Sequence, residues 1–201
     1  SYNNTKVAIN TLGFQLLNHP DLATQKSFEI LNNFSELTHQ LVINNINEEH
    51  IVQFAINKKI LKTLKGHFNK DAICFGDFGL LQSVIESDKK NAFVIAQILN
   101  NEITLAAFNN QSLQFFNKFS TQNQEDVLYY ILSVYQNCNL NPNEHQLYLT
   151  GLIEKQSPLY QLIFDYIRNV DFTAGFTNKK MMDSSFSDSP HYYYNLFNLG
   201  K

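Results

Sequence analysis

Arginine is almost absent from this chain of 201 residues, because only Arg168 among its fifteen basic residues is an arginine. Arginine is the preferred side chain for two-pronged contacts to phosphates and base edges. The formal net charge is −3. Both facts argue against a nucleic-acid partner. Lys58, Lys59, Lys62 and Lys65 lie close together in the sequence, and a solvated helix face explains them best.

Cysteine and long apolar runs are also scarce. The two cysteines, Cys74 and Cys138, are too few and too far apart for a zinc site or a disulfide framework. Their apolar surroundings predict buried free thiols in a reducing compartment. No apolar run approaches the roughly 20 residues that cross a bilayer, and no signal-peptide pattern is visible. We therefore expect a cytoplasmic protein without a membrane span.

Residues 1–90 are expected to form an N-terminal lobe that is incomplete, with further strands upstream of Ser1. Apolar alternation and turn residues predict its elements. The expected strands are 6–9, 13–17, 39–46, 50–57 and 72–76, and the expected helices are 22–37, 58–68 and 78–90.

Residues 91–201 have a more regular pattern and are expected to form a second lobe. Expected strands are 92–99, 102–108, 112–118, 146–150 and 169–174, and expected helices are 124–138, 159–167 and 191–199. Thr121 is the expected N-cap of the first of these helices, and Leu128, Ile131, Leu132 and Tyr135 its inward stripe. The order βββαβαβα predicts a mixed α/β fold, a mixed sheet with helices packed on it, as in the ribonuclease-H-like unit.

Three stretches carry a family resemblance: the run from "EITLAAFNNQ" to "QLYLTG" (102–151), "SPLYQLIFDYIRNVDF" (157–172) and "SPHYYYNLFNL" (189–199). The early "VAINTLGFQLLNHPDL" is similar too. Together they resemble an uncharacterised bacterial family, a domain of unknown function with the actin-like ATPase fold. The resemblance implies two ribonuclease-H-like lobes with nucleotide bound between them.

The resemblance also implies where a nucleotide would be held, and there the sequence departs from the pattern. Active actin-like proteins hold phosphate on Asp-x-Gly hairpin turns. Asn101 and Glu102 occupy the corresponding turn, which has no glycine and adds a carboxylate. The adenosine-binding Gly-Gly turn aligns with Thr150 and Gly151, where one glycine remains. We therefore expect a degraded cleft, in which alanine at Asn101 or Gly151 leaves function untouched.

The remaining candidate motifs are explained by structural roles and not by catalysis or metal binding. Asp77-Phe78-Gly79 matches the magnesium triplet of kinases, but no neighbouring kinase signature is present, and Asp77 is the expected N-cap of the next helix. A second interpretation is that this triplet is an Asp-x-Gly phosphate turn at an unusual place in the fold. Glu49 and His50 lack a second metal ligand at useful spacing. The tyrosines of 191–197, and Tyr129, Tyr130 and Tyr135 on the long helix, suit either a core or a partner surface.

The sequence therefore favours a non-catalytic actin-like module, a pseudo-ATPase that serves as a protein-interaction or scaffold domain. It would engage a protein partner through the groove between the lobes or an exposed sheet edge. No catalytic residue, metal or cofactor is expected. The alternative is an ATP–Mg²⁺-binding member, or a small-molecule kinase, whose phosphate turn lies upstream of Ser1.

Overall fold

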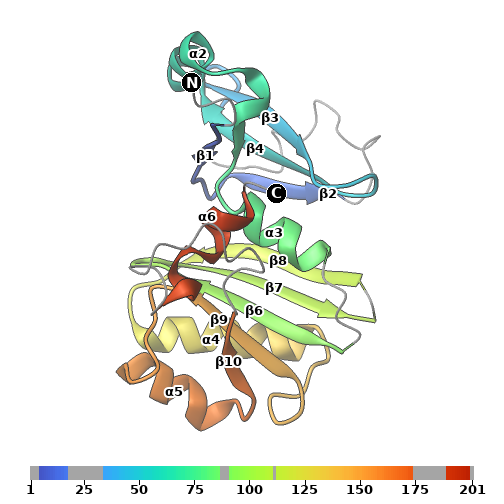
Figure 1. The fold of residues 1–201 in the computed structure, drawn as a ribbon, viewed down its shortest axis with the longest axis vertical. Helices are drawn as coiled ribbons and strands as arrows, with labels where there is room; N and C mark the ends of the chain where they lie inside the picture. The colour runs from blue at the N-terminus through green and yellow to red at the C-terminus, as the bar shows by residue number, and fades with distance from the viewer. Residues whose placement is uncertain (1–4, 18–33, 87–90, 111, 174–188, 200–201) are drawn as a thin grey trace. The chain divides into compact units, whose positions relative to one another are not determined.

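The structure is a computed structural model that describes residues 5–17, 34–86, 91–110, 112–173 and 189–199 (Figure 1). Its contacts divide the chain into two compact units. The first comprises Ser1–Gly79 with Leu199–Lys201, and the second comprises Leu80–Asn198. We describe each unit by itself. No helix of the described residues is long and apolar enough to cross a membrane.

The first unit contains two small sheets. Strands β1 (Val7–Ile9) and β5 (Ile73–Phe75) pair in parallel, and β2 (Phe14–Leu17), β4 (Ile51–Asn57) and β3 (His39–Asn45) form an antiparallel sheet in that order. Tilted aromatic pairs join the two sheets, because Phe75 packs on Phe14 and Phe54 with centroid distances of 4.6 and 5.9 Å. The five strands that the sequence predicts here are all present.

Two helical segments follow β4 in the first unit. Helix α2 (Lys58–His67) begins where the Asn57 side chain accepts the Lys59 N–H, and the short 3-10 helix η2 (Lys70–Ala72) precedes β5. The helix expected at 22–37 falls mostly on residues outside the described ranges. Its expected end is wrong, because residues 36–38 form a turn in which the Thr38 N–H donates to Ser35 O at 3.1 Å.

The second unit is a five-stranded mixed sheet in the order β10-β9-β6-β7-β8. Strands β6 (Phe93–Ile98), β7 (Glu102–Asn109) and β8 (Ser112–Ser120) form an antiparallel meander. Strands β9 (Gln146–Gly151) and β10 (Val170–Phe172) then join β6 in parallel, because helical crossovers separate them. This is the predicted βββαβαβα order, and the mixed α/β class is confirmed.

Helices cover both faces of this sheet (Figure 1). Helices α4 (Gln124–Asn137) and α5 (Pro158–Tyr166) lie on one face. On the other face lie α3 (Phe78–Ile85) and, beyond the 3-10 turn η5 (Pro190–Tyr193), the short α6 (Tyr194–Asn198). The sequence predicted the lobe boundary after residue 90, whereas Leu80 and Val84 of α3 pack against the sheet of the second unit.

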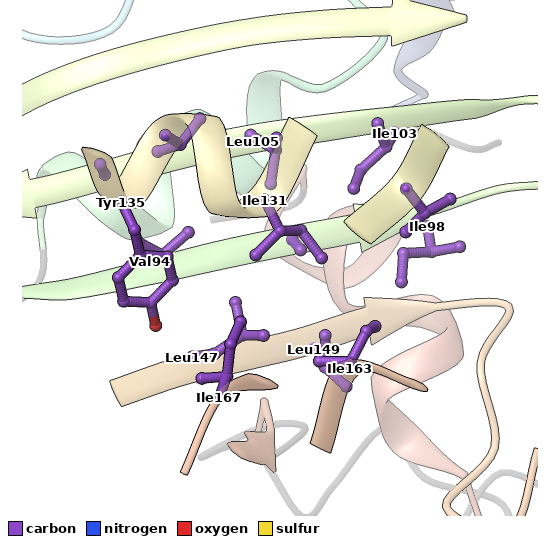
Figure 2. Packing of buried hydrophobic residues seen from close by; sticks show 14 of the residues in the cluster. Val94, Ile98, Ile103, Leu105, Ile131, Tyr135, Leu147, Leu149, Ile163 and Ile167 are labelled. Carbon is purple, nitrogen blue, oxygen red and sulfur yellow. The ribbon is translucent and has the colours of Figure 1, made fainter. Parts of the chain in front are cut away.

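The larger core fills the space between the sheet and helices α4 and α5 (Figure 2). Ile131 of α4 and Ile163 of α5 are fully buried against the strands. Each such side chain stabilises the fold by about 1.5–3 kcal/mol through its burial. Of the expected inward stripe, Leu132 is only partly buried, and the sequence reading missed Val127 and Val134, which are buried.

The caps of α4 and α5 follow from short polar side chains. Asn123 accepts the Asp126 N–H at 2.8 Å at the start of α4, and Ser157 accepts the Tyr160 N–H at the start of α5, where Pro158 fills the first turn. The prediction that Thr121 caps α4 is wrong. Strand β8 continues to Ser120, and Thr121 extends the sheet by donating its N–H to Asn101 O at 2.8 Å.

Candidate functional site

A row of polar side chains crosses the second sheet on the face that carries α3 and α6. The members are direct register neighbours on four strands, and all are buried: Lys118, Thr104, Gln97 and Thr150. Their neighbours on this face are apolar residues such as Phe93, Ile95 and Ala106. Burying polar side chains costs free energy unless they are hydrogen-bonded. Four of them side by side in an otherwise apolar sheet make this end of the sheet the candidate site.

The β6–β7 turn lies at the same end of the sheet. Ile98 pairs with Ile103 across the turn and with Gly151 on the other side, so the ends of β6 and β9 share one edge. In open α/β sheets ligands bind outside the carboxyl ends of the parallel strands. We call this edge, with the β6–β7 turn and the residues after β9, the carboxyl edge. It brings together Asn101, Glu102, Thr150 and Gly151.

Backbone groups of the β6–β7 turn are already engaged in hydrogen bonds within the protein. The Leu99 N–H donates to Glu102 O at 2.9 Å, and Asn101 O accepts from Thr121 at 2.8 Å. Among the described non-glycine residues a positive φ occurs only at Asn110 and Asn139, so this turn has no left-handed residue. The αR–αL form of anion cradle, in which successive N–H groups converge, needs such a conformation.

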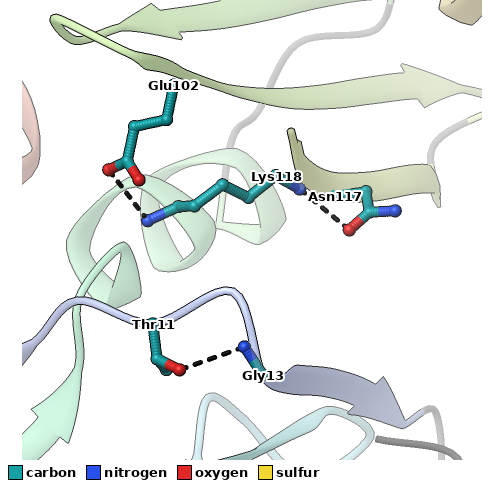
Figure 3. A network of polar contacts seen from close by, with 5 residues as sticks. All are labelled: Thr11, Gly13, Glu102, Asn117 and Lys118. Atoms are coloured by element: carbon teal, nitrogen blue, oxygen red, sulfur yellow. Dashed lines mark hydrogen bonds and ion pairs between the residues drawn. The ribbon is translucent and has the colours of Figure 1, made fainter. Parts of the chain in front are cut away.

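Glu102 is engaged by an internal cation. Its Oε1 lies 3.6 Å from the Lys118 Nζ, and the Lys118 side chain is fully buried (Figure 3). The two residues are diagonal neighbours on adjacent strands. A buried ammonium group requires a compensating charge. Glu102 therefore serves to balance Lys118, a role that the sequence reading did not assign.

Gly151 is required by the fold at the end of β9. Its φ is +84°, a conformation that side chains rarely adopt. A Cβ at this position would collide with the backbone carbonyl of Ile98, which accepts the Leu152 N–H at 2.7 Å. Gly151→Ala is therefore expected to strain this turn whether or not a ligand is present, and its effect on function stays a prediction.

The chain's own C-terminal segment packs on the carboxyl edge. The Thr150 hydroxyl donates to the backbone carbonyl of His191, and the His191 Nε2 lies 2.8 Å from Ile153 O. The His191 ring packs on Phe172 of β10 with a centroid distance of 4.2 Å. Burial lowers the pKa of His191, and the Ile153 carbonyl and the Glu154 carboxylate act in the opposite direction.

A small pocket remains beside the β6–β7 turn. It has a volume of about 270 Å³ and is lined from the turn, the start of α4 and the residues after β9, among them Asn100, Thr121, Asn123 and Leu152. Ligand pockets for drug-sized molecules measure about 300–1,000 Å³. No lysine or arginine is among its described lining residues. The pocket can hold a small polar group, but it offers no cation to a triphosphate.

The other candidates from the sequence do not assemble into a site. Asp77 is buried directly before α3 in the first unit. His50 Nδ1 lies 3.1 Å from Asn47 Oδ1, and the Glu49 N–H donates to the same oxygen, so both residues belong to a turn. The described residues contain no group of three or more metal-ligating side chains. Cys74 is buried and Cys138 half-buried, both as free thiols.

The polar row was missed because each member looks ordinary in its own strand. Gln97, Thr104, Lys118 and Thr150 each interrupt an apolar run once, and single polar residues in strands are common. A signal was available, because the predicted strands place all four near one end of the sheet. Recognising it requires the strand order and register, which the local pattern does not supply.

Comparisons with known proteins agree on the fold. The model of a family described as "Protein of unknown function (DUF3822)" matches residues 21–170. A search of curated proteins found no match. A solved protein of actin-like ATPase fold and unknown function, from Bacteroides thetaiotaomicron, is 19% identical with a TM-score of 0.70. That match covers 86% of this chain and 69% of the other.

The structure of a PilM–PilN type IV pilus biogenesis complex is similar as well. It matches at 11% identity with a TM-score of 0.60, and covers 98% of this chain and 79% of that one. At these identities the likeness concerns the fold alone. The chain has the actin-like ATPase fold, as the sequence predicted.

Proposed function

The chain belongs to DUF3822, a family of unknown function, and we propose that it is a non-catalytic actin-like module that acts as a protein-interaction or scaffold domain in the cytoplasm. In this proposal the carboxyl edge of the second sheet no longer serves nucleotide chemistry. The observation that carries the proposal is the packing of the chain's own residues 190–198 on that edge, through Thr150 and His191.

The β6–β7 turn supports the same conclusion. A polyphosphate at this turn would meet the Glu102 carboxylate, and the nearby ammonium of Lys118 is already paired with that carboxylate. Two charges of opposite sign that neutralise each other provide little attraction for an incoming anion. The turn also lacks the glycine that lets a backbone approach a phosphate.

The two outer strands of the second sheet bear on how a partner would bind. At the β8 edge the Asn117 side chain accepts the Lys118 N–H at 2.8 Å (Figure 3). At the β10 edge Asp171 accepts the Phe172 N–H at 2.8 Å. A side chain that accepts a backbone N–H of an edge strand makes that N–H unavailable to a further strand. We therefore favour binding through side-chain surfaces over extension of the sheet.

The PilM–PilN complex is one example of this fold in a protein assembly, as its description states. It makes a role in protein binding a reasonable one for the fold.

The alternative function is ATP binding, and two observations favour it. The 270 Å³ pocket lies at the start of α4, and helix N-termini attract anions. Thr173, directly after β10, has a buried hydroxyl that finds no hydrogen-bond partner among the described residues. A small-molecule kinase would also need a general-base carboxylate at the site, and Asp77 remains the candidate from the sequence.

Equilibrium dialysis of the full-length natural protein against labelled ATP and ADP, with Mg²⁺ present, separates the two functions. The proposed function predicts no saturable binding and no release of phosphate. Saturable binding that disappears on Lys118→Met would establish the alternative. Lys118→Met removes the one cation of the row and replaces it with a side chain of similar length, so it is the sharpest variant for this purpose.

A further inference from the structure

We propose that helix α2 of the first unit is a docking surface for an acidic segment of a partner protein. Its docking stripe consists of Lys58, Lys59, Lys62 and Lys65, together with Gly66. This inference deepens the proposed interaction role by naming the chemistry of the partner. It rests on a different unit from the carboxyl edge, so the two proposals can fail separately.

The charge of this segment contrasts with the rest of the chain. The thirteen residues from Lys58 to Lys70 contain five lysines and no acidic residue, although the whole chain has a net charge of −3. All four lysines of the docking stripe are exposed. None of them forms an ion pair with an acidic side chain of the described residues. The stripe is thus a compact positive patch on a negative protein.

The arrangement of the lysines does not favour the helix itself. Lys58 and Lys59 lie in the first turn, where the helix dipole is positive and no acidic residue is present. Lys58 and Lys62 are four residues apart, and Lys62 and Lys65 are three apart, so like charges face each other. Lys65 alone is placed favourably, in the last turn. An anionic partner would relieve these repulsions.

Gly66 adds an independent observation. It lies four residues after Lys62 and continues the line of Lys58 and Lys62 along the helix. A Cβ at Gly66 would meet no atom within 4 Å, and its φ is not positive. Neither crowding nor backbone conformation therefore requires glycine, although glycine disfavours a helix. A bare turn next to lysines lets a partner's chain approach the helix backbone.

The structure favours an acidic polypeptide over a membrane or a nucleic acid. A helix that binds a membrane surface needs a broad exposed apolar face. The apolar side of α2 is turned inward, with Leu61 buried, and Ile60 is the one large apolar side chain it exposes. A nucleic acid is disfavoured by the negative net charge and the single arginine.

The test is the binding of a fluorescein-labelled decaglutamate peptide to the full chain, followed by fluorescence anisotropy at low salt. We expect Lys62→Gln to weaken binding about threefold, and Lys58→Gln with Lys62→Gln about tenfold, with all binding weakened by added salt. Lys155→Gln neutralises an exposed lysine in the second unit and should leave the affinity unchanged. Gly66→Ala keeps every charge, and should weaken binding without lowering the melting temperature.

Three outcomes would overturn the proposal. One is a Lys62→Gln variant that binds the peptide as well as Lys155→Gln does. Another is an unchanged peptide affinity in Gly66→Ala, which would exclude close approach at this turn. The third is tighter binding of phosphatidylglycerol vesicles or of duplex DNA than of the peptide. None of these results affects the nucleotide test, because that test concerns the second unit.

Discussion

The hydroxyl of Thr150 donates a hydrogen bond to the backbone carbonyl of His191, forty-one residues further along the chain. Thr150 ends the polar row of the second sheet, and His191 is the second residue of the 3-10 turn η5. This contact links the carboxyl edge to the chain's own last residues. The stability of the second unit and the proposed loss of nucleotide binding are therefore expected to depend on the same few groups.

Thr150→Val removes this hydroxyl and keeps the shape of the side chain. We expect a loss of about 0.5–1.5 kcal/mol in the free energy of unfolding, because the His191 carbonyl loses one of its two donors and keeps the Tyr194 N–H. Urea denaturation monitored by circular dichroism measures the change. Thr150→Ser retains the hydroxyl and serves as the control. If valine and serine variants were equally stable, the hydrogen bond would have no energetic role.

The stability should depend on pH through His191. Its pKa is lowered because burial disfavours the imidazolium form. In the unfolded chain a histidine titrates near pH 6.5. Below that pH the imidazole of His191 is protonated in the unfolded state, whereas in the folded state it stays neutral until a lower pH. The contribution of His191 is thus complete above about pH 6.5 and is lost as the pH falls toward its folded pKa.

The measurement for His191 is the free energy of unfolding between about pH 5 and 8, in the natural chain and in His191→Gln. Glutamine can still donate to Ile153 O but does not titrate. We expect the difference between the two proteins to diminish toward low pH, because only the natural chain loses stability there through residue 191. A constant difference across this range would contradict the role of the buried imidazole.

Two glycine substitutions should have opposite effects. Gly151→Ala is expected to destabilise the chain by about 2–4 kcal/mol, because φ is +84° and the new Cβ collides with the Ile98 carbonyl. Gly66→Ala is expected to stabilise it by up to about 1 kcal/mol, because the site is helical and open. Thermal unfolding of both variants checks the pair. A stabilised Gly151→Ala would refute the constraint at this turn.

Replacing the exposed tyrosine on α4 should affect stability much less than replacing a buried one. Tyr129 is 66% exposed, whereas Tyr135 is buried and its hydroxyl donates to His145 O at 3.2 Å. We expect Tyr129→Ala to change stability by no more than about 0.5 kcal/mol, and Tyr135→Ala to cost about 3–5 kcal/mol through the cavity it leaves. Urea denaturation of both variants measures this. Equal losses would place Tyr129 in the core.

Most of the second unit could be predicted from the sequence because its elements are local and strongly patterned. The apolar runs from Phe93 to Ser120, the periodicity of α4 and the Ser157-Pro158 start of α5 each contain their own signal. The N-cap of α4 was misplaced because Thr121, Gln122 and Asn123 are all polar. Only the bond from Thr121 to Asn101 reveals that the sheet continues that far.

The candidate site could be predicted only in part. Glu102 and Gly151 were singled out as departures from a family pattern, but their physical roles depend on neighbours from other strands. Lys118, which Glu102 balances, is sixteen residues away, and the Ile98 carbonyl that Gly151 must avoid lies on β6. The contribution of His191 depends on the path of the chain after β10, and no local pattern specifies it.

The melting temperature of the full-length protein with and without Mg²⁺–ATP tests the central claim most directly. A ligand at a hundredfold excess over its dissociation constant adds about 2.7 kcal/mol, or about 5–10 °C for a chain of this size. Because residues 190–198 pack on the β9 side of the carboxyl edge, we expect no shift at millimolar Mg²⁺–ATP. A saturable rise of several degrees, abolished by Lys118→Met, would contradict the account.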